Sequence, residues 1–395
     1  MAADDGRGSA HGDLARRGGH VTRVALVASS FAPYVGGVEE HVRHVAAGLR
    51  ARGHDVVVWV VDRGDADAPD VVDGVRVRRL PTPMPARSAG SVARFALRAP
   101  GAWRAWQQAL REDRPDLLNV QCFGPNGAWA TALAVLSRRR LVVSSHGETY
   151  SDADDVFTHS ALLRRSLVAA LRRADAVTGC SDHVVRDLEG RFALAPGRAV
   201  VVPNGVDPAE PAAEVTLPAR YLLAVGRVVR TKGFDLLLEA FAVAALPDVA
   251  LVIGGDGPER EALAARAREL GVPVHLPGRL DRGQVVAAMA GALAVVVPSR
   301  VEAFGIVVLE GWRSGAPIVV TSHGGPADLV TDGVDGLVVD PHDTAALARA
   351  LRLVVTDAEA ARRMGAAGRA AVAAFTWDRV VDDYEAVYAA AGARP

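Results

Sequence analysis

The chain has 395 residues, of which 50% are hydrophobic and 23% are charged. Its 45 basic and 46 acidic residues leave a formal net charge of −1, so no overall electric field attracts nucleic acid or an anionic membrane. The composition excludes a disordered or fibrous protein, and the length favours two or three globular domains. Two cysteines, Cys122 and Cys180, are too few for a disulfide framework or a four-cysteine metal site.

The N-terminal residues and the longest uncharged stretch bear on location. Residues 1–20 contain Ala, Gly, Asp and Arg without an apolar core, so we expect a disordered leader rather than a signal peptide. Residues 119–137 carry no charge, but polar side chains, a proline and two glycines interrupt them. They predict a strand, a turn and a helix rather than a membrane span. We therefore expect a cytoplasmic protein.

Short β-branched runs alternate with longer amphipathic runs, which is typical of βαβ units and a parallel sheet. In the first half we predict strands at 23–28, 56–61, 75–80, 117–121, 141–145, 176–179 and 199–203, with helices that include 39–52, 91–111 and 161–173. In the second half we predict strands at 221–225, 250–254, 274–276, 294–298, 318–321 and 337–339, with helices that include 259–270, one from about Gly305, and 377–390.

The stretch between the two halves is rich in Pro, Ala and Glu and follows a turn sequence. The sequence therefore predicts two doubly wound α/β domains, residues 21–206 and 219–375, joined by a linker at 207–218 and followed by a terminal segment, 376–395, with a helix. Ligands of open parallel sheets bind beyond the carboxyl ends of the strands. The cleft between the two domains is the expected site.

The second domain opens with a charged turn between a strand and a helix. Arg227 and Lys232 lie in this turn, between Gly226 and Gly233. A guanidinium provides a planar fork of donors and an ammonium a compact point charge, a pair suited to a diphosphate. Lys232 is the one lysine among the 45 basic residues, which indicates a position that arginine does not fill, although a codon accident is the alternative.

The strongest local pattern is a pair of glutamates separated by an apolar segment. Glu302 lies in the loop after the predicted strand 294–298, and Glu310 lies in the helix predicted from Gly305. Free N–H groups at the start of that helix would favour an anion in the cleft. Carboxylates accept hydrogen bonds from vicinal hydroxyls, so sugar and ribose are the expected partners.

Two other turns at strand ends give weaker signals. Gly36 and Gly37 precede a helix without the spacing of a dinucleotide-binding loop, which disfavours a nicotinamide cofactor; a tight turn explains them equally well. His146 follows the predicted strand 141–145 and is expected to point into the cleft. A loop histidine satisfied by the backbone is the alternative.

In their order and spacing, Gly226-Arg227 with Lys232-Gly233, and Glu302 with Glu310, resemble the motifs of retaining glycosyltransferase family 4, which has the GT-B fold. The resemblance spans about residues 21–390. It implies two Rossmann-like domains facing a central cleft, with the terminal helix, 376–395, crossing back to the N-terminal domain. It also implies transfer of a hexose or related sugar from a nucleotide-diphosphate sugar to an acceptor hydroxyl with retention of configuration. The donor would lie mainly against the second domain and the acceptor against the first, without a metal or other cofactor.

The resemblance also implies roles for individual residues. Arg227 and Lys232 would hold the donor diphosphate, Glu302 the sugar hydroxyls and Glu310 the ribose, and His146 would lie near the anomeric carbon. The predicted catalytic residues are His146, Arg227, Lys232 and Glu302. The further predicted donor-binding residues are Gly37, Leu280, Phe304, Gly305, Ile306, Val307 and Glu310. Fixed cations and helix N–H groups would stabilise the departing diphosphate, whose oxygen would take the acceptor proton on the same face.

Two other enzyme classes are alternatives to this transferase. A metal-dependent transferase would use Asp-x-Asp, which occurs at Asp65 and Asp67 and at Asp152 and Asp154, but acidic surface loops are commoner and leave the charged turn and the glutamate pair unexplained. A nucleotide-sugar epimerase or hydrolase would share the donor pocket and need no acceptor.

A peripheral membrane contact is conceivable at the predicted helix 91–111, where Trp103 and Trp106 are mixed with arginines. A helix that buries its tryptophans and exposes its arginines is the favoured explanation.

Overall fold

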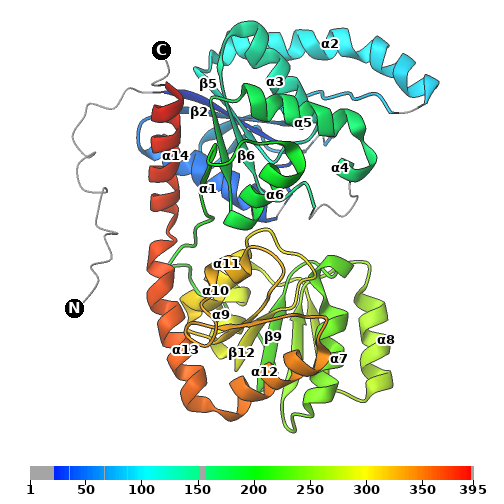
Figure 1. Cartoon of the computed structure of the whole chain (residues 1–395), viewed down its shortest axis with the longest axis vertical. Coiled ribbons are helices and arrows are strands. Elements are labelled where there is room, and N and C mark those ends of the chain that lie inside the picture. Colours follow the sequence, from blue (N-terminus) through cyan, green and yellow to red (C-terminus); the bar gives the residue numbers. More distant parts are fainter. Residues whose placement is uncertain (1–21, 35, 66, 87, 151–155, 393–395) are drawn as a thin grey trace.

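The computed structural model describes residues 22–34, 36–65, 67–86, 88–150 and 156–392, so the predicted leader and the pair Asp152 and Asp154 lie outside the described residues. Two α/β domains lie one above the other, each built on one sheet with helices on both faces (Figure 1). The predicted fold class, two doubly wound parallel-sheet domains, is confirmed. Both sheets arise from β-branched strands buried on both faces, as is usual where helices cover a parallel sheet.

The sheet of the first domain has the strand order β3-β4-β2-β1-β5-β6-β7-β8. Its strands are β1 (Arg23–Ala28), β2 (Asp55–Val61), β3 (Val71–Val72), β4 (Val75–Leu80), β5 (Leu117–Gln121), β6 (Arg140–Ser145), β7 (Ala176–Gly179) and β8 (Ala199–Val201). Every pair is parallel except β3 with β4. The sequence analysis did not predict this antiparallel edge strand. It forms because Asp73 and Gly74, both at positive φ, make the two-residue turn of a hairpin.

The helices of the first domain are α1 (Gly37–Ala51), α2 (Ala89–Asp113), α3 (Pro125–Ser137), α4 (Val156–His159), α5 (Ala161–Arg173) and α6 (Asp182–Phe192). Helix α2 continues through Pro100 and extends past the body of the domain (Figure 1). Trp106 is buried in its C-terminal half, where its indole N–H donates to the carbonyl of Pro81, whereas Leu97 in the other half is 82% exposed. Burial of Trp106 agrees with the structural explanation favoured for this helix.

The sheet of the second domain has the order β11-β10-β9-β12-β13-β14, and all its pairs are parallel. Its strands are β9 (Tyr221–Val225), β10 (Ala250–Gly254), β11 (Val274–Gly278), β12 (Ala294–Val297), β13 (Ile318–Thr321) and β14 (Leu337–Val339). Its helices are α7 (Phe234–Ala244), α8 (Arg260–Leu270), α9 (Arg282–Gly291), α10 (Ile306–Ser314), α11 (Pro326–Leu329), α12 (Thr344–Thr356) and α13 (Ala358–Ala371), with 3-10 turns η1 (Arg230–Lys232) and η2 (Val372–Ala374).

Helix α14 (Trp377–Gly392) runs back along the first domain and packs on α1 (Figure 1). The chain passes the domain boundary twice at one place, where Val206 pairs with Thr376 in a short parallel bridge. Tyr384 and Tyr388 of α14 are buried in the core of the first domain. Within the described residues, no helix combines the length and apolar character that a membrane crossing needs.

Candidate active site

The loop after β9 places a lysine against a glutamate of another loop. Lys232 ends the turn η1, and its side chain runs past Gly226, where an added Cβ would lie 3.7 Å from Lys232 Cε. Its Nζ donates to Glu302 Oε2 at 2.6 Å, and both side chains are partly buried. Arg227 is exposed, and its guanidinium makes no hydrogen bond or ion pair within the described residues. This turn of the second domain therefore presents the paired ammonium of Lys232 and the unpaired guanidinium of Arg227, with Arg230 exposed between them.

The Glu302 loop is held from behind by the loop after β13. The backbone N–H of Glu302 donates to the His323 carbonyl at 3.1 Å, and the N–H of Gly325 donates to the Glu302 carbonyl at 2.9 Å. Gly324 has φ +119°, and a Cβ there would lie 1.9 Å from the Glu302 carbonyl oxygen. Only glycine allows this approach. The sequence analysis missed this support, although the glycine pair after a predicted strand was a visible signal.

Helix α10 begins beside the Lys232–Glu302 pair. Gly305 precedes its first residue with φ +88°, and Ile306 and Val307 supply its first free N–H groups. Across the domain boundary lies Gly37, where an added Cβ would be 3.4 Å from Ile306 Cδ1. Phe304 is 3% exposed, so its side chain belongs to the core rather than to the surface of the site. The helix end, with its positive dipole, therefore faces the first turn of α1.

A pocket of about 140 Å³ lies behind α10. It is lined by Glu210, Val225, Leu280, Arg282, Val285, Glu310 and Arg313. Burial raises the pKa of Glu310, an effect that Arg313 and Arg282 oppose. The pocket thus brings together two predicted donor-binding residues, Leu280 and Glu310. It has apolar side chains and a carboxylate in its lining.

His146 lies at the end of β6, among buried polar groups. Its Nε2 is 2.8 Å from Gln121 Oε1, and its ring centroid is 4.6 Å from that of His41. Burial lowers the pKa of His146 well below the usual 6.5, and His41 lowers it further. The imidazole is therefore neutral at physiological pH.

A chain of amides decides which nitrogen of His146 carries the proton. Asn119 Nδ2 faces the Val142 carbonyl, which can only accept, so Asn119 Oδ1 accepts from Gln121 Nε2 at 2.7 Å and from the Tyr388 hydroxyl at 2.9 Å. Gln121 Oε1 must then accept from Nε2–H of His146. Nδ1 therefore carries the lone pair of the ring and can act as a hydrogen-bond acceptor. The sequence analysis predicted His146 but not Gln121.

Glu148 fixes the backbone of this loop. Its carboxylate accepts from the N–H of Phe123 at 2.8 Å, the N–H of His146 at 2.7 Å and the hydroxyl of Ser145 at 3.0 Å. Burial raises its pKa, and these hydrogen bonds oppose the rise. The carboxylate therefore ties the turn after β5 to the turn after β6.

Polar contacts also join the domains around the cleft. The Ser181 hydroxyl donates to the Ala303 carbonyl at 2.6 Å, and Arg186 donates to Asp328 at 2.8 Å. An apolar cluster that includes Cys180 of the first domain and Ala303 of the second continues across the boundary. The structure therefore has the two domains in direct contact beside the candidate site.

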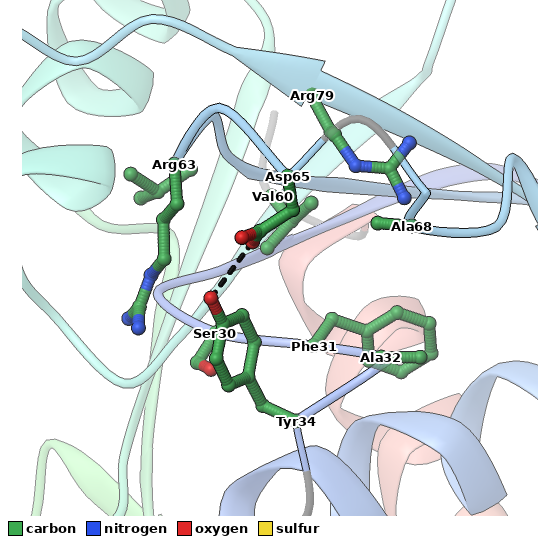
Figure 2. A pocket seen from close by; sticks show the side chains of 10 residues that line it. Ser30, Phe31, Ala32, Tyr34, Val60, Arg63, Asp65, Ala68 and Arg79 are labelled. Carbon is green, nitrogen blue, oxygen red and sulfur yellow. Dashed lines mark hydrogen bonds between the residues drawn. The ribbon is translucent and has the colours of Figure 1, made fainter.

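A second, smaller pocket lies on the first domain, beyond the ends of β1, β2 and β4 (Figure 2). Figure 2 shows the Tyr34 hydroxyl donating to Asp65 at 2.7 Å, which links two loops, while Arg63 stacks on the Tyr34 ring and Arg79 lines the far side. Tyr34, one of its lining residues, precedes Gly37 by three residues in the chain. Within the described residues, no group of three or more His, Cys, Asp or Glu side chains has an arrangement suited to a metal ion.

Two family models match almost the whole chain. The model described as Glycosyl transferases group 1 matches residues 211–371, and the model described as Glycosyltransferase Family 4 matches residues 35–210. The two matches meet inside the segment that the sequence predicts as a linker.

Relatives and solved structures agree with these matches. The chain is 29% identical to the glycogen synthase of Mycobacterium tuberculosis over 93% of this chain and 95% of that protein. It is 30% identical to a GDP-mannose-dependent alpha-(1-6)-phosphatidylinositol monomannoside mannosyltransferase of Mycolicibacterium smegmatis, over 87% of this chain and 92% of that protein. Sucrose-phosphate synthase from Thermosynechococcus elongatus has a similar structure, with a TM-score of 0.77 and 23% identity over 93% of this chain and 98% of that one.

Proposed function

Because this chain belongs to the family 4-type glycosyltransferases of GT-B fold, we propose that it moves a hexose or related sugar from a nucleotide-diphosphate sugar to an acceptor hydroxyl with retention of configuration. Glycosyltransferase activity follows from the family. The donor class, the stereochemistry and the residue roles are the proposal. A relative of 30% identity is named as dependent on GDP-mannose, which supports a nucleotide-sugar donor here.

The single observation that carries the proposal is the Lys232–Glu302 pair beside the start of α10. The ammonium lies 2.6 Å from the carboxylate, so one side of the pair suits a phosphate oxygen and the other a sugar hydroxyl. The unpaired guanidinium of Arg227 and the first N–H groups of α10 add donors for the same anion. Glu310 and Leu280 share a pocket that would take the ribose and the base.

The proposed reaction breaks the bond between the anomeric carbon and the donor phosphate oxygen and forms a bond from that carbon to the acceptor oxygen. The acceptor proton passes to the departing phosphate oxygen, so the products are a glycoside and a nucleoside diphosphate. Fixed charges that favour the leaving group in the transition state more than in the ground state accelerate the step. Lys232, Arg227 and the α10 terminus would supply this stabilisation without a metal ion.

His146 would act from the first domain. Its neutral imidazole can accept a hydrogen bond from a sugar hydroxyl at Nδ1, which places the sugar without adding a positive charge beside the forming oxocarbenium ion.

A panel of nucleotide sugars tests this function. Thermal unfolding in UDP-, ADP- and GDP-sugars identifies the donor as the ligand that raises the midpoint most, because a ligand of the folded state stabilises it by mass action. Nucleoside diphosphate release is then measured with candidate acceptors and EDTA, and the anomeric configuration of the product is assigned by NMR. Rapid epimerisation of the donor without acceptor, inversion of configuration, or loss of activity in EDTA would each contradict a part of the proposal.

A further inference from the structure

The hydroxyl of Tyr150 is buried and has no hydrogen-bond partner within the described part of the chain. A buried hydroxyl without a partner costs about 1–3 kcal/mol of folding free energy, because it loses its bonds to water. Phenylalanine would fill the same space without this cost. A tyrosine here therefore calls for a partner that the described residues do not supply.

Tyr150 lies where the two domains meet. It follows His146 by four residues, and its N–H donates to the Gly147 carbonyl at 3.2 Å. Its ring packs edge-to-face on His183 with centroids 5.2 Å apart. It also packs against the apolar cluster that contains Ala303, next to Glu302 in the chain. The ring is thus packed on α6 of the first domain, next to an apolar cluster that both domains share.

Charged groups of both domains surround the phenol. Burial raises the pKa of Tyr150 above its usual range, and Cys180, Asp187, Glu148 and Glu302 raise it further. Burial therefore favours the protonated phenol, which can act as a hydrogen-bond donor.

The nearby carboxylates have partners of their own. Glu302 accepts from Lys232 at 2.6 Å, and Asp187 accepts from Thr149 at 2.6 Å. These groups are oriented toward other residues, while the phenolic O–H is left over. Its oxygen is closed to bulk water in this arrangement of the domains. A substrate atom enclosed in the cleft is the partner that fits these conditions.

We propose that Tyr150 is a specificity-determining residue whose phenolic O–H donates a hydrogen bond to one hydroxyl of the transferred sugar. The proposal rests on the proposed function, since it needs a sugar between the Glu302 loop and the His146 loop. Tyr150 belongs to the second of these loops and lies within electrostatic range of the first. It would hold the sugar from the side of the first domain, opposite Glu302.

The variant Tyr150→Phe tests the proposal, since it removes only the oxygen. We expect an unchanged or higher unfolding midpoint, because the hydroxyl has no partner to lose among the described residues. We expect kcat/KM for the nucleotide-sugar donor to fall about tenfold, the size of one hydrogen bond to a neutral group. The matched control is Tyr221→Phe, whose hydroxyl donates to the Ala288 carbonyl at 2.7 Å: it should lower the midpoint and leave turnover unchanged.

Two further measurements identify the partner. Binding of the nucleoside diphosphate alone should be the same in Tyr150→Phe and the wild type, because it lacks the sugar. Among donors that each lack one sugar hydroxyl, one should be turned over equally by both proteins, because its missing hydroxyl is the partner of Tyr150.

Each other result overturns the proposal. A lower midpoint in Tyr150→Phe would mean that the hydroxyl has a structural partner, and an equal loss with every deoxy donor would mean that it does not touch the sugar. Wild-type kinetics in Tyr150→Phe would refute it while leaving the transferase function intact. A wild type inactive with every nucleotide sugar would instead refute the proposed function.

Discussion

Lys232 Nζ and Glu302 Oε2 lie 2.6 Å apart although 70 residues separate them in the chain. Two loops that follow different strands, β9 and β12, bring them together at one edge of the sheet. The carboxylate orients the ammonium, and the pair lies next to the helix terminus that would share its anion. We therefore expect the shape of the Lys232 ammonium to matter as well as its charge.

Replacing Lys232 by alanine should lower kcat/KM by about 10²–10³-fold, the usual loss for one group that stabilises developing charge. Lys232→Arg should restore only a small part, because a forked guanidinium does not fit the space beside Gly226 that the lysine stem follows. Steady-state nucleoside diphosphate release measures both. The control is Arg230→Ala. The side chain of Arg230 is exposed in the same turn, so this variant should keep full turnover. Full activity in Lys232→Arg would show that charge alone matters.

Gly324 supports the Glu302 loop through backbone proximity, so it should tolerate no side chain. Gly324→Ala places a Cβ 1.9 Å from the Glu302 carbonyl oxygen at φ +119°, and the loop must move. We expect turnover to fall at least tenfold and the free energy of unfolding to fall by about 2–4 kcal/mol. Gly333→Ala, also at positive φ but with nothing within 4 Å of the new Cβ, should cost only the backbone strain. Equal effects in the two variants, by urea unfolding and rate, would refute the role of the contact.

Much of this arrangement was accessible from the sequence. Strands showed as short β-branched runs because each is buried on both faces, as with β2 and β12. The charged turn and the glutamate pair were visible because strand ends meet at one edge in a parallel sheet. The antiparallel β3 was missed because two residues carry no periodic signal.

Contacts between distant segments were not accessible. Gln121 gave no sign of its contact with His146, because a polar residue at a strand end is equally compatible with solvent. The bond from the Tyr384 hydroxyl to His41 depends on how α14 docks on the first domain, which no local pattern encodes. Contacts between elements far apart in the chain depend on how those elements pack, and the spacing of residues in the sequence does not reveal them.

His41 should make stability depend on pH in a defined window. Its ring is fully buried between Asn204 and Tyr384, and burial lowers its pKa from 6.5 to about 4. Between pH 6.5 and about pH 4, the His41 imidazole is protonated in the unfolded chain but not in the folded protein. The free energy of unfolding therefore falls as the pH decreases, by about 1.4 kcal/mol per pH unit. Above pH 7 both states are neutral and the dependence vanishes.

The variant His41→Gln removes this contribution. Relative to the variant, the wild type should lose about 3 kcal/mol of unfolding free energy between pH 7 and pH 4. Comparing the two proteins by urea unfolding cancels the carboxylates, which titrate in both. Parallel stability curves over this range would show that the His41 imidazole is not desolvated in the folded protein.

Arg282 connects the domains beside the ribose pocket and should favour the closed arrangement. It forms ion pairs with Glu40 of α1 and with Glu210 of the linker. Exposed pairs of this kind contribute about 0.2–1 kcal/mol each and weaken with salt.

Arg282→Ala should therefore raise the radius of gyration, measured by solution X-ray scattering. The measurement is made without donor, so that a direct contact between Arg282 and the substrate cannot affect it. The variant should also raise the donor KM about two- to fivefold at 0.05 M salt and by less at 0.5 M salt. Arg266→Ala removes two ion pairs, with Glu239 and Glu269, inside one domain and should change neither quantity. An Arg282→Ala protein as compact as the wild type, with the same salt dependence of KM, would show that this bridge does not hold the cleft closed.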